Sequence, residues 1–533
     1  MTEPYSLNTD YGYDPLGNLT SVVQHGTSSE TARQRNFVYD SLSRLTSATN
    51  PETGQVSYNY YDNGILHQKT DARGVWTAYA YDALNRLTDK YFNDGLTPNQ
   101  HFRYDQTSSW AGTQYNTIGR LSEAYTDQDR RYYGSGSPPA CNPQSSSTAN
   151  YNPAYGNPTY CEWTDELYSY DSTGRVNRIP AAFPSEGGWS AHETDIGYDL
   201  AGNVTSLRYP DGRAVTQGWD AGGRMTSSVF DNWNGQHVGY TYASGFTYTP
   251  AGAQTEMTMG NGVYTHVPYN NRQQICQVWI QNPQQTLMDK HYFYTAGSGY
   301  CANNAGNNGN IAQIQDMQNN NRSQSFSYDA LNRLSSFSNG DDSMQQSYTM
   351  DSFGNMSQSG TLNFQGNYTA SGDNRINLNG YGYDLAGNLT NVNNGLPSTY
   401  SFDAESKIFN VNTGGAYYTY DAAGERMRKD TAGSFTEYQY LQGQPIAEKN
   451  SDGTWSDYIY ANGQRIARAD SFDARIHVHG TTPGGATASW LISGGGYIIK
   501  PNDRLFLRQY QYMGFGGTEY PVYRWNSDLP DVS

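Results

Sequence analysis

The feature that most constrains the fold is a short motif that recurs along most of the chain. It begins with an aromatic residue and aspartate and continues with two variable residues, glycine or asparagine, arginine or asparagine, and an aliphatic residue. A unit that recurs in this way predicts an array of small structural units that stack on their neighbours. The clear copies include those that begin at Tyr13-Asp14, Tyr39-Asp40, Tyr81-Asp82, Tyr170-Asp171, Tyr198-Asp199, Trp219-Asp220, Tyr328-Asp329, Tyr383-Asp384 and Tyr420-Asp421.

Each position of the motif has a role in a tight β-hairpin. Aspartate is a favoured first residue of a type I turn, and the glycine or asparagine three places on accepts the positive φ angle that a G1 bulge requires. Gly17, Gly202 and Gly387 fill this slot in three of the copies. The sequence therefore predicts one short-loop hairpin for each motif.

The register of such a hairpin places the residue after the bulge opposite the aspartate. One residue further out, Tyr81 should face Leu87 on the other side of the ribbon. We expect charged pairs on one face and tyrosines with aliphatic partners on the other. An exposed ion pair contributes under about 1 kcal/mol to stability, whereas a buried aromatic side chain contributes a few kcal/mol. The tyrosines should therefore hold neighbouring hairpins together. The expected charged pairs are Asp82 with Arg86, Asp171 with Arg175, Asp220 with Arg224, and Asp329 with Arg333.

A second kind of turn lies between the motifs, as in Asp71-Ala72-Arg73-Gly74. Alternating turns predict a continuous antiparallel meander, and the 48 tyrosines and 56 glycines agree with an all-β chain rich in turns. We expect this array over residues 1–467, with insertions near 131–165 and 276–310. Residues 468–533 lack the motif and predict a separate β-rich cap or the start of a β-sandwich.

The four cysteines fall into two local pairs, one in each insertion. Three connectivities are open, but pairing Cys141 with Cys161 and Cys276 with Cys301 closes the shortest loops. Such disulfides indicate an oxidising compartment, whereas four unrelated thiols would not.

The C-terminal segment offers candidate binding residues. Its aromatic side chains could form a stacking platform for sugar rings, although they equally suit the core and surface of a sheet. His477 and His479 share a strand face, but two histidines without a third ligand are more often ordinary surface, so we expect no metal and no other cofactor. The candidate glycan-binding residues are Trp490, Tyr497, Tyr510, Tyr512, Tyr523 and Trp525.

Charge and motif searches argue against several classes of function. A net charge of −17 disfavours nucleic acid and anionic membranes as partners, and no apolar stretch is long enough to span a membrane. The first residues do not resemble a secretory signal, so a processed chain, a fragment or another export route is expected. Neither a serine-hydrolase elbow, nor a zinc-protease helix motif, nor a phosphate-binding loop occurs. We therefore expect no catalytic residues and no enzyme activity.

The copies YDALNRLT, YDLAGNLT and YDAAGERM strongly resemble the tyrosine-aspartate (YD) repeat of rearrangement-hotspot (Rhs) proteins, toxin-complex subunits and teneurins, over roughly residues 10–465. The resemblance implies a spiralling β-sheet that can form a hollow shell around a C-terminal toxin, or a cell-surface contact as in teneurins. It also implies a bacterial origin and an extracellular or cell-surface destination. Toxin-enclosing relatives normally end in an aspartate-containing autoprotease segment, and this chain has no match to it; its Asp14-Pro15 pair lies at the opposite end.

Two functions remain. The first is a non-enzymatic extracellular scaffold, surface fibre or adhesion protein that associates with itself or binds glycans. The alternative is an Rhs-type shell that encloses and delivers a toxin cargo. The missing autoprotease segment favours the first.

Overall fold

The computed structural model describes two compact units, residues Met1–Ser471 and Phe472–Ser533. The boundary expected after residue 467 lies close to this division. The described residues are 7–108, 111–126, 164–183, 191–233, 235–295, 297, 299–302, 306–368, 372–392, 398–412, 415–471, 476–481 and 487–492.

Nearly all regular structure in these ranges is β-strand. Unit 1 holds a 27-stranded sheet and a 10-stranded sheet, and unit 2 holds a two-stranded sheet. A single-turn 3₁₀ helix, Asn320–Arg322, joins β23 to β24.

The strands of the larger sheet are β1 (Thr9–Tyr13), β2 (Leu19–Gln24), β3 (Arg33–Tyr39), β4 (Leu45–Asn50), β5 (Gly54–Tyr60), β6 (Leu66–Thr70), β7 (Trp76–Tyr81), β8 (Leu87–Phe92), β9 (Gln100–Tyr104), β10 (Leu121–Thr126), β11 (Asp165–Leu167), β12 (Ser169–Tyr170), β13 (Val176–Ala182), β14 (Ala191–Tyr198), β15 (Val204–Arg208), β16 (Arg213–Trp219), β17 (Met225–Trp233), β18 (Gln236–Tyr248), β19 (Gln254–Met259), β20 (Tyr264–His266), β21 (Gln277–Gln281), β22 (Thr286–Phe293), β23 (Gln313–Asp316), β24 (Gln324–Tyr328), β25 (Leu334–Asn339), β26 (Gln345–Met350) and β27 (Met356–Gly360). Those of the smaller sheet are β28 (Gly382–Tyr383), β29 (Leu389–Val392), β30 (Ser398–Phe402), β31 (Ile408–Val411), β32 (Ala416–Tyr420), β33 (Arg426–Thr431), β34 (Ser434–Leu441), β35 (Gln444–Asn450), β36 (Trp455–Ala461) and β37 (Gln464–Ser471); unit 2 contains β38 (Ile476–Thr481) and β39 (Thr487–Ile492).

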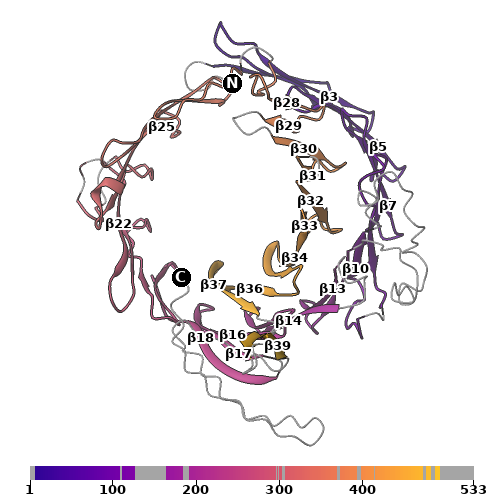
Figure 1. Cartoon of the computed structure of the whole chain (residues 1–533). Helices are drawn as coiled ribbons and strands as arrows, with labels where there is room; N and C mark the ends of the chain where they lie inside the picture. Colours follow the sequence, from indigo (N-terminus) through magenta and orange to yellow (C-terminus); the bar gives the residue numbers. More distant parts are fainter. Residues whose placement is uncertain are drawn as a thin grey trace, which may run out of the picture. The chain divides into compact units, whose positions relative to one another are not determined.

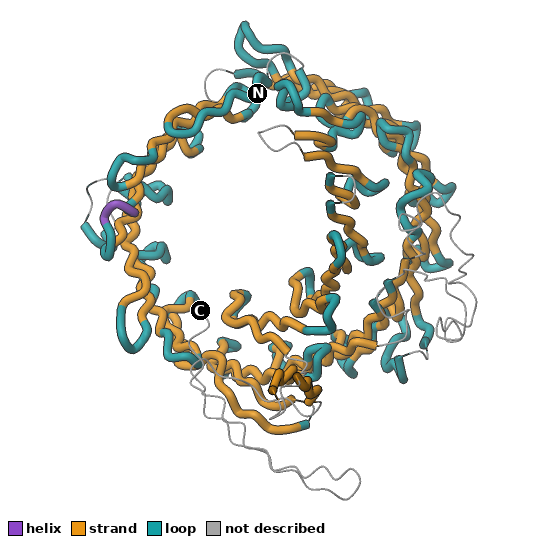
Figure 2. The backbone as a smooth tube through the Cα atoms, viewed as in Figure 1, coloured by secondary structure: helices purple, strands orange, loops and turns teal. Residues whose placement is uncertain are grey.

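The strands form the predicted antiparallel meander, in which nearly every strand pairs with the next along the chain and turns recur at both strand ends (Figure 2). Exceptions in unit 1 are β11, which pairs with β13, and β27 and β28, which belong to different sheets. The two kinds of turn therefore lie on opposite edges of the sheet. We call the edge with the motif turns, such as Asp40–Arg44 and Asp82–Arg86, the motif rim. The other edge, with turns such as Asp71–Val75, is the return rim.

Within unit 1 the sheet curves, so that strands late in the sequence return beside the first ones (Figure 1). Ser352, in the β26–β27 turn, donates a hydrogen bond to Glu30 before β3, and the Arg33 guanidinium lies 4.2 Å from the centre of the Phe353 ring. From there, β28–β37 follow the earlier strands as a second layer. The spiral that the motif resemblance implied is thus present within unit 1.

The largest buried core of unit 1 lies where the last strands meet β13–β16. Phe183, Tyr209 and Val215 from the larger sheet pack with Met427 and Ile459 from the smaller one, and all five are nearly inaccessible to solvent. Much of the remaining sheet is only half-buried, because a strip of hairpins has few neighbours to cover its faces. Unit 2 contributes one described hairpin, in which Ile476 pairs with Ile492.

Candidate functional site

The motif turn is organised by its aspartate side chain. In the copy at Asp82, Oδ1 accepts hydrogen bonds from the backbone N–H groups of Leu84 and Arg86, both at 2.9 Å. The second oxygen, Oδ2, accepts one from Arg86 Nε at 2.7 Å. Hydrogen bonds from the backbone and side chain of Arg86 hold the pKa of Asp82 below its usual value. The expected pairing of this aspartate with its arginine is confirmed, and the other three pairs have the same bond.

The register and the bulge are also as predicted. Tyr81 lies opposite Leu87, with the register shift of a bulge beside it. The bulge residue has a positive φ in glycine copies and in copies with another residue. Examples are Gly17 at 85°, Gly202 at 92°, Gly387 at 90°, Asn85 at 61°, Asn332 at 60° and Ser43 at 59°.

In nine of the described hairpins, a hydrogen bond from an aromatic side chain reaches the hairpin before it. The Tyr198 hydroxyl donates to the backbone carbonyl of Val176 at 2.8 Å, and Trp219 uses its indole Nε1 for Val204 at 2.7 Å. The motif aromatics therefore connect neighbouring hairpins as expected, through hydrogen bonds in addition to burial. The same bond runs from Tyr60 to Leu45, Tyr170 to Leu121, Tyr248 to Met225, Tyr294 to Ile275, Tyr328 to Ile311, Tyr420 to Ile408 and Tyr460 to Pro445.

The arginine of the motif also reaches the next hairpin. Arg175 bonds Asp171 of its own turn, while its guanidinium lies 4.6 Å from the centre of the Tyr198 ring and donates to the Asp199 carbonyl at 2.7 Å. The expected separation into a charged and an apolar face is therefore wrong at the motif rim. A guanidinium is planar and weakly hydrated, so it can pair with a carboxylate and cover an aromatic ring at once. The same stacking joins Arg44 to Tyr60, Arg86 to Tyr104, Arg120 to Tyr170 and Arg224 to Tyr248.

Between the two layers, motif turns of the later strands lie against return-rim turns of the earlier ones; we call this the layer contact. Arg73 donates to the backbone carbonyls of Asp403 at 3.0 Å and Ala404 at 3.4 Å, and it lies 3.5 Å from the carboxylate of Asp384. The backbone N–H of Ala404 donates to Thr97 Oγ1 at 2.8 Å. The turns of the two rims thus dock through backbone groups as well as charges.

Glu405 extends the layer contact into the strands. Its carboxylate pairs with Lys90 at 3.0 Å and Lys407 at 2.9 Å and accepts a bond from Gln100 at 2.9 Å. Although burial opposes the charge, these two lysines and Gln100 lower the pKa of Glu405 to about 2. It is therefore ionised at neutral pH.

In the buried core, a contact between an arginine and an aspartate joins the two sheets. Arg213 Nε donates to Asp457 Oδ2 at 2.7 Å across the two sheets, and Asp211 lies 3.6 Å from the same guanidinium. Burial and the neighbouring Asp211 raise the pKa of Asp457 well above its usual value. Within the described residues, Asp211 Oδ2 and Asp457 Oδ1 have no hydrogen-bond donor. Protonation of Asp457, which its raised pKa favours, lets its carboxyl group donate a hydrogen bond to Asp211.

A second acidic pair lies at the layer contact. Glu166, on β11, accepts a hydrogen bond from the Tyr168 hydroxyl at 2.6 Å, and Asp421 belongs to the motif turn after β32. Burial raises the pKa of Glu166, and burial together with Glu166 raises that of Asp421. The pKa of each of these two carboxyl groups is therefore higher than usual where the layers meet.

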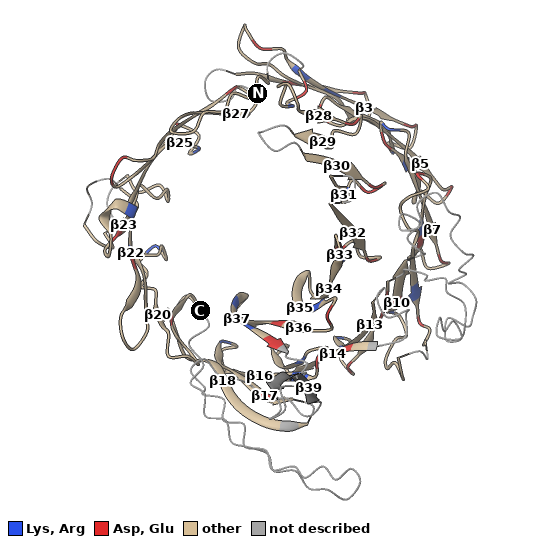
Figure 3. Cartoon of the chain, in the orientation of Figure 1, with Lys and Arg blue, Asp and Glu red and all other residues tan. Residues whose placement is uncertain are grey.

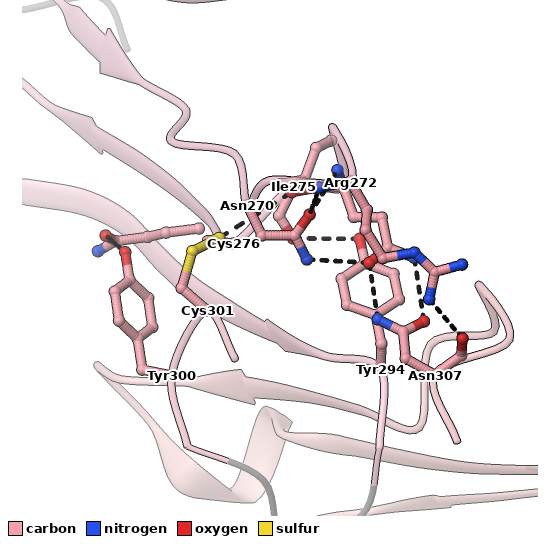
Figure 4. The surroundings of a disulfide bond; sticks show 10 residues. Asn270, Arg272, Ile275, Cys276, Tyr294, Tyr300, Cys301 and Asn307 are labelled. Atoms are coloured by element: carbon pink, nitrogen blue, oxygen red, sulfur yellow. Dashed lines mark hydrogen bonds between the residues drawn. A yellow bond between two sulfur atoms is a disulfide. The ribbon is translucent and has the colours of Figure 1, made fainter. Parts of the chain in front are cut away.

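The predicted pairing of Cys276 with Cys301 is present as a disulfide, with the Cα atoms 4.9 Å apart (Figure 4). The bond encloses the β21–β22 hairpin. Beside it, Arg272 donates to the backbone carbonyl of Asn307 at 2.5 Å, and the Tyr300 hydroxyl to Gln277 at 2.9 Å. Neither Cys141 nor Cys161 falls within the described residues.

The candidate glycan-binding residues lie in unit 2. Trp490 is in strand β39, pairing with Val478, while Tyr497, Tyr510, Tyr512, Tyr523 and Trp525 lie outside the described residues.

Across the described ranges, no three histidine, cysteine or acidic side chains gather as a metal site would require. The helices found there include none that could cross a bilayer. Charged residues are dispersed in small patches along the strands and turns (Figure 3).

Comparison with known proteins supports the motif assignment. A family model described as RHS Repeat matches residues 198–231, which run from the last residue of β14 through β15 and β16 into β17. No curated protein sequence matches the chain.

Among solved structures, the crystal structure of TcdB2-TccC3 matches with a TM-score of 0.63 and 15% identity, over 87% of this chain and 25% of that chain. The Tc holotoxin pore of Photorhabdus luminescens matches with a TM-score of 0.59 and 15% identity, over 91% of this chain and 27% of that chain. The crystal structure of TcdB2-TccC3 without its hypervariable C-terminal region matches with a TM-score of 0.61 and 15% identity, over 92% of this chain and 27% of that chain. The chain thus spans about a quarter of each of these proteins.

At this identity the likeness concerns the fold. The recurring motif, its hairpin geometry and the matching family model agree with one another: the chain carries an RHS repeat at residues 198–231, resembles the YD-repeat proteins of the Rhs family, and has a fold similar to that of toxin-complex proteins.

Proposed function

We propose that the chain is a non-enzymatic wall segment of an Rhs-type shell that shields a polypeptide cargo, with a toxin as the class of cargo. The observation that carries this proposal is the layer contact, in which the strip of hairpins winds back onto itself. A sheet that bonds its own later turns to its earlier ones is suited to form a continuous wall.

The comparisons support the shell more than the surface fibre or adhesion protein favoured by the sequence. The similar structures are of a Tc holotoxin and of TcdB2-TccC3, a protein with a hypervariable C-terminal region. We propose an extracellular, bacterial destination, which the Cys276–Cys301 disulfide supports because such bonds persist in oxidising compartments.

The test is protection of an attached polypeptide. A protease-sensitive, unfolded reporter is fused after Ser533 of the full chain and digested with a small protease, with the same reporter added as a separate molecule for comparison. A wall that encloses its cargo should slow cleavage of the fused reporter at least tenfold relative to the separate one. Equal cleavage rates would contradict the shell.

A reporter fused before Met1 provides a matched control for simple steric hindrance by attachment. Protection of the C-terminal fusion alone would identify the cargo end of the chain. Equal slowing at both ends would mean that attachment, rather than enclosure, hinders the protease.

A further inference from the structure

Six motif-rim turns in the described part of the first layer each carry an exposed aliphatic side chain. Singly exposed leucines are ordinary, but six aliphatic side chains along one edge indicate a surface for docking. Leu16, Leu42, Leu84 and Leu331 stand two residues after the turn aspartate, and Leu200 stands one residue after it. The exposed fractions are Leu16 70%, Leu42 69%, Leu84 72%, Ile118 74%, Leu200 101% and Leu331 40%.

Several motif turns of unit 1 are covered by return-rim residues of the first layer. In the second layer Ala404 and Ala422, one residue after the motif aspartate, are 7% and 2% exposed, whereas Ala423, at the position that corresponds to Leu16, is exposed. In the larger sheet, the ring of Phe353 in the β26–β27 turn lies under Arg33. Leu385 keeps an exposed side chain, but Gly387 in the same turn lies directly against the backbone of Glu52. The structure itself therefore shows what partners a motif rim: the return rim of another layer of YD-repeat sheet.

The chain also carries an uncovered copy of the complementary surface. The return-rim turns of the second layer, which follow β31, β33 and β35, are exposed and rich in small residues. Their exposed residues include Asn412, Gly415, Ala432, Gly433, Ser434, Ser451, Asp452 and Gly453. Within the described residues, the molecule thus presents exposed turns of both kinds; return-rim turns of the first layer that follow β19, β21 and β25 are exposed as well.

From this complementarity we propose that the first-layer motif rim, at Leu16, Leu42 and Leu84, docks onto the second-layer return rim, at Ala432 and Ser451, of a second copy of this chain. The contact repeats between molecules the layer contact that exists within one molecule. Because the two surfaces differ, the interface is heterologous, and copies add head to tail until the stack closes or ends. This assembly would extend the proposed wall, but it does not depend on the presence of cargo.

The test uses the full chain and two rim variants. The motif-rim variant carries Leu16→Lys, Leu42→Lys and Leu84→Lys, and the return-rim variant carries Ala432→Lys and Ser451→Lys. All five side chains are exposed, so both variants should fold. Sedimentation-velocity ultracentrifugation over a concentration series should show wild-type chains forming species larger than dimers. Each variant alone should associate at least tenfold more weakly.

Mixing the two variants gives the sharpest result, because each retains the rim that the other lacks. A heterologous contact predicts a one-to-one dimer in the mixture and no larger species.

A control with Tyr11→Lys and Val38→Lys, whose exposed side chains lie on strands β1 and β3, should associate like wild type. The chain has a net charge of −17, so added lysines weaken general repulsion between copies. A monomeric wild type, an unaffected variant, or a mixture without dimers would overturn the proposal.

Discussion

Replacing the bulge glycine with valine at different turns tests two effects separately: the backbone strain of a motif turn, and the packing of that turn against the other layer. Gly17, Gly202 and Gly387 have almost the same φ, but a Cβ atom at each would meet different surroundings. No heavy atom lies within 4 Å at Gly17, and the nearest atom at Gly202 is an Arg175 nitrogen at 4.0 Å. At Gly387 the Cβ would lie only 2.2 Å from the carbonyl oxygen of Glu52, across the layer contact.

Valine at any of the three positions forces a β-branched residue to positive φ, which costs about 1–3 kcal/mol. We expect amide hydrogen exchange in the affected hairpin to become roughly 5- to 140-fold faster, since 1.4 kcal/mol corresponds to a factor of ten. Gly17→Val and Gly202→Val should change only their own hairpins. Gly387→Val should also speed exchange in the β4–β5 hairpin, because the Glu52 backbone must move.

Asparagine provides the matched control. Asn85 and Asn332 already occupy this slot at φ 61° and 60°, so Gly17→Asn should leave exchange nearly unchanged. Gly387→Asn retains an acceptable φ but still places a Cβ against Glu52, so it should disturb the β4–β5 hairpin with little effect on its own turn. If Gly387→Val left the β4–β5 hairpin untouched, the layer contact as described would be refuted.

Three further predictions concern other contacts. Tyr198→Phe removes the hydroxyl that is bonded to the Val176 carbonyl, so it should lower the free energy of unfolding in urea by about 0.5–1.5 kcal/mol. Tyr13→Phe, at an exposed ring, should have no effect. Equal effects of the two substitutions would show that the tyrosine hydrogen bond contributes nothing to stability. Asp457 has a folded-state pKa above its unfolded value of about 3.8, so its contribution is complete below that pH and declines as the pH rises toward the folded pKa. Asp457→Asn, which keeps a neutral group beside Asp211, should therefore flatten the loss of stability as the pH rises above about 3.8, as measured by urea unfolding at each pH; an unchanged pH profile would argue against the raised pKa of Asp457. Cys301→Ser should speed hydrogen exchange in the β21–β22 hairpin but not in β3–β4, and unchanged exchange in both would mean that the disulfide does not constrain this segment.

Local chemistry made much of the hairpin predictable from the sequence. The aspartate of the motif selects a type I turn, and glycine or asparagine at the bulge fixes the register, so the pairing of Tyr81 with Leu87 followed without knowledge of the fold. The disulfide between Cys276 and Cys301 followed from sequence separation alone. These features depend on residues that are close together in the chain.

The contacts between hairpins were only partly predictable. Burial of the motif tyrosines was expected, but their hydrogen bonds to the preceding hairpin depend on the distance between neighbouring strands. The stacking of Arg175 on Tyr198 was missed because the sequence shows one arginine and one aspartate in each turn and suggests that they satisfy each other. The recurrence of an arginine before the next tyrosine was the signal that could have indicated it.

The layer contact was decided by the tertiary structure. Arg73 meets Asp403, and Arg213 meets Asp457, because twist and curvature add up over many strands. A small change in the curvature per strand would bring different hairpins together, and no local pattern encodes that sum. The sequence alone therefore determined the repeating hairpin, whereas the accumulated curvature of the sheet decided which repeats meet, which charges are buried and which rim remains exposed.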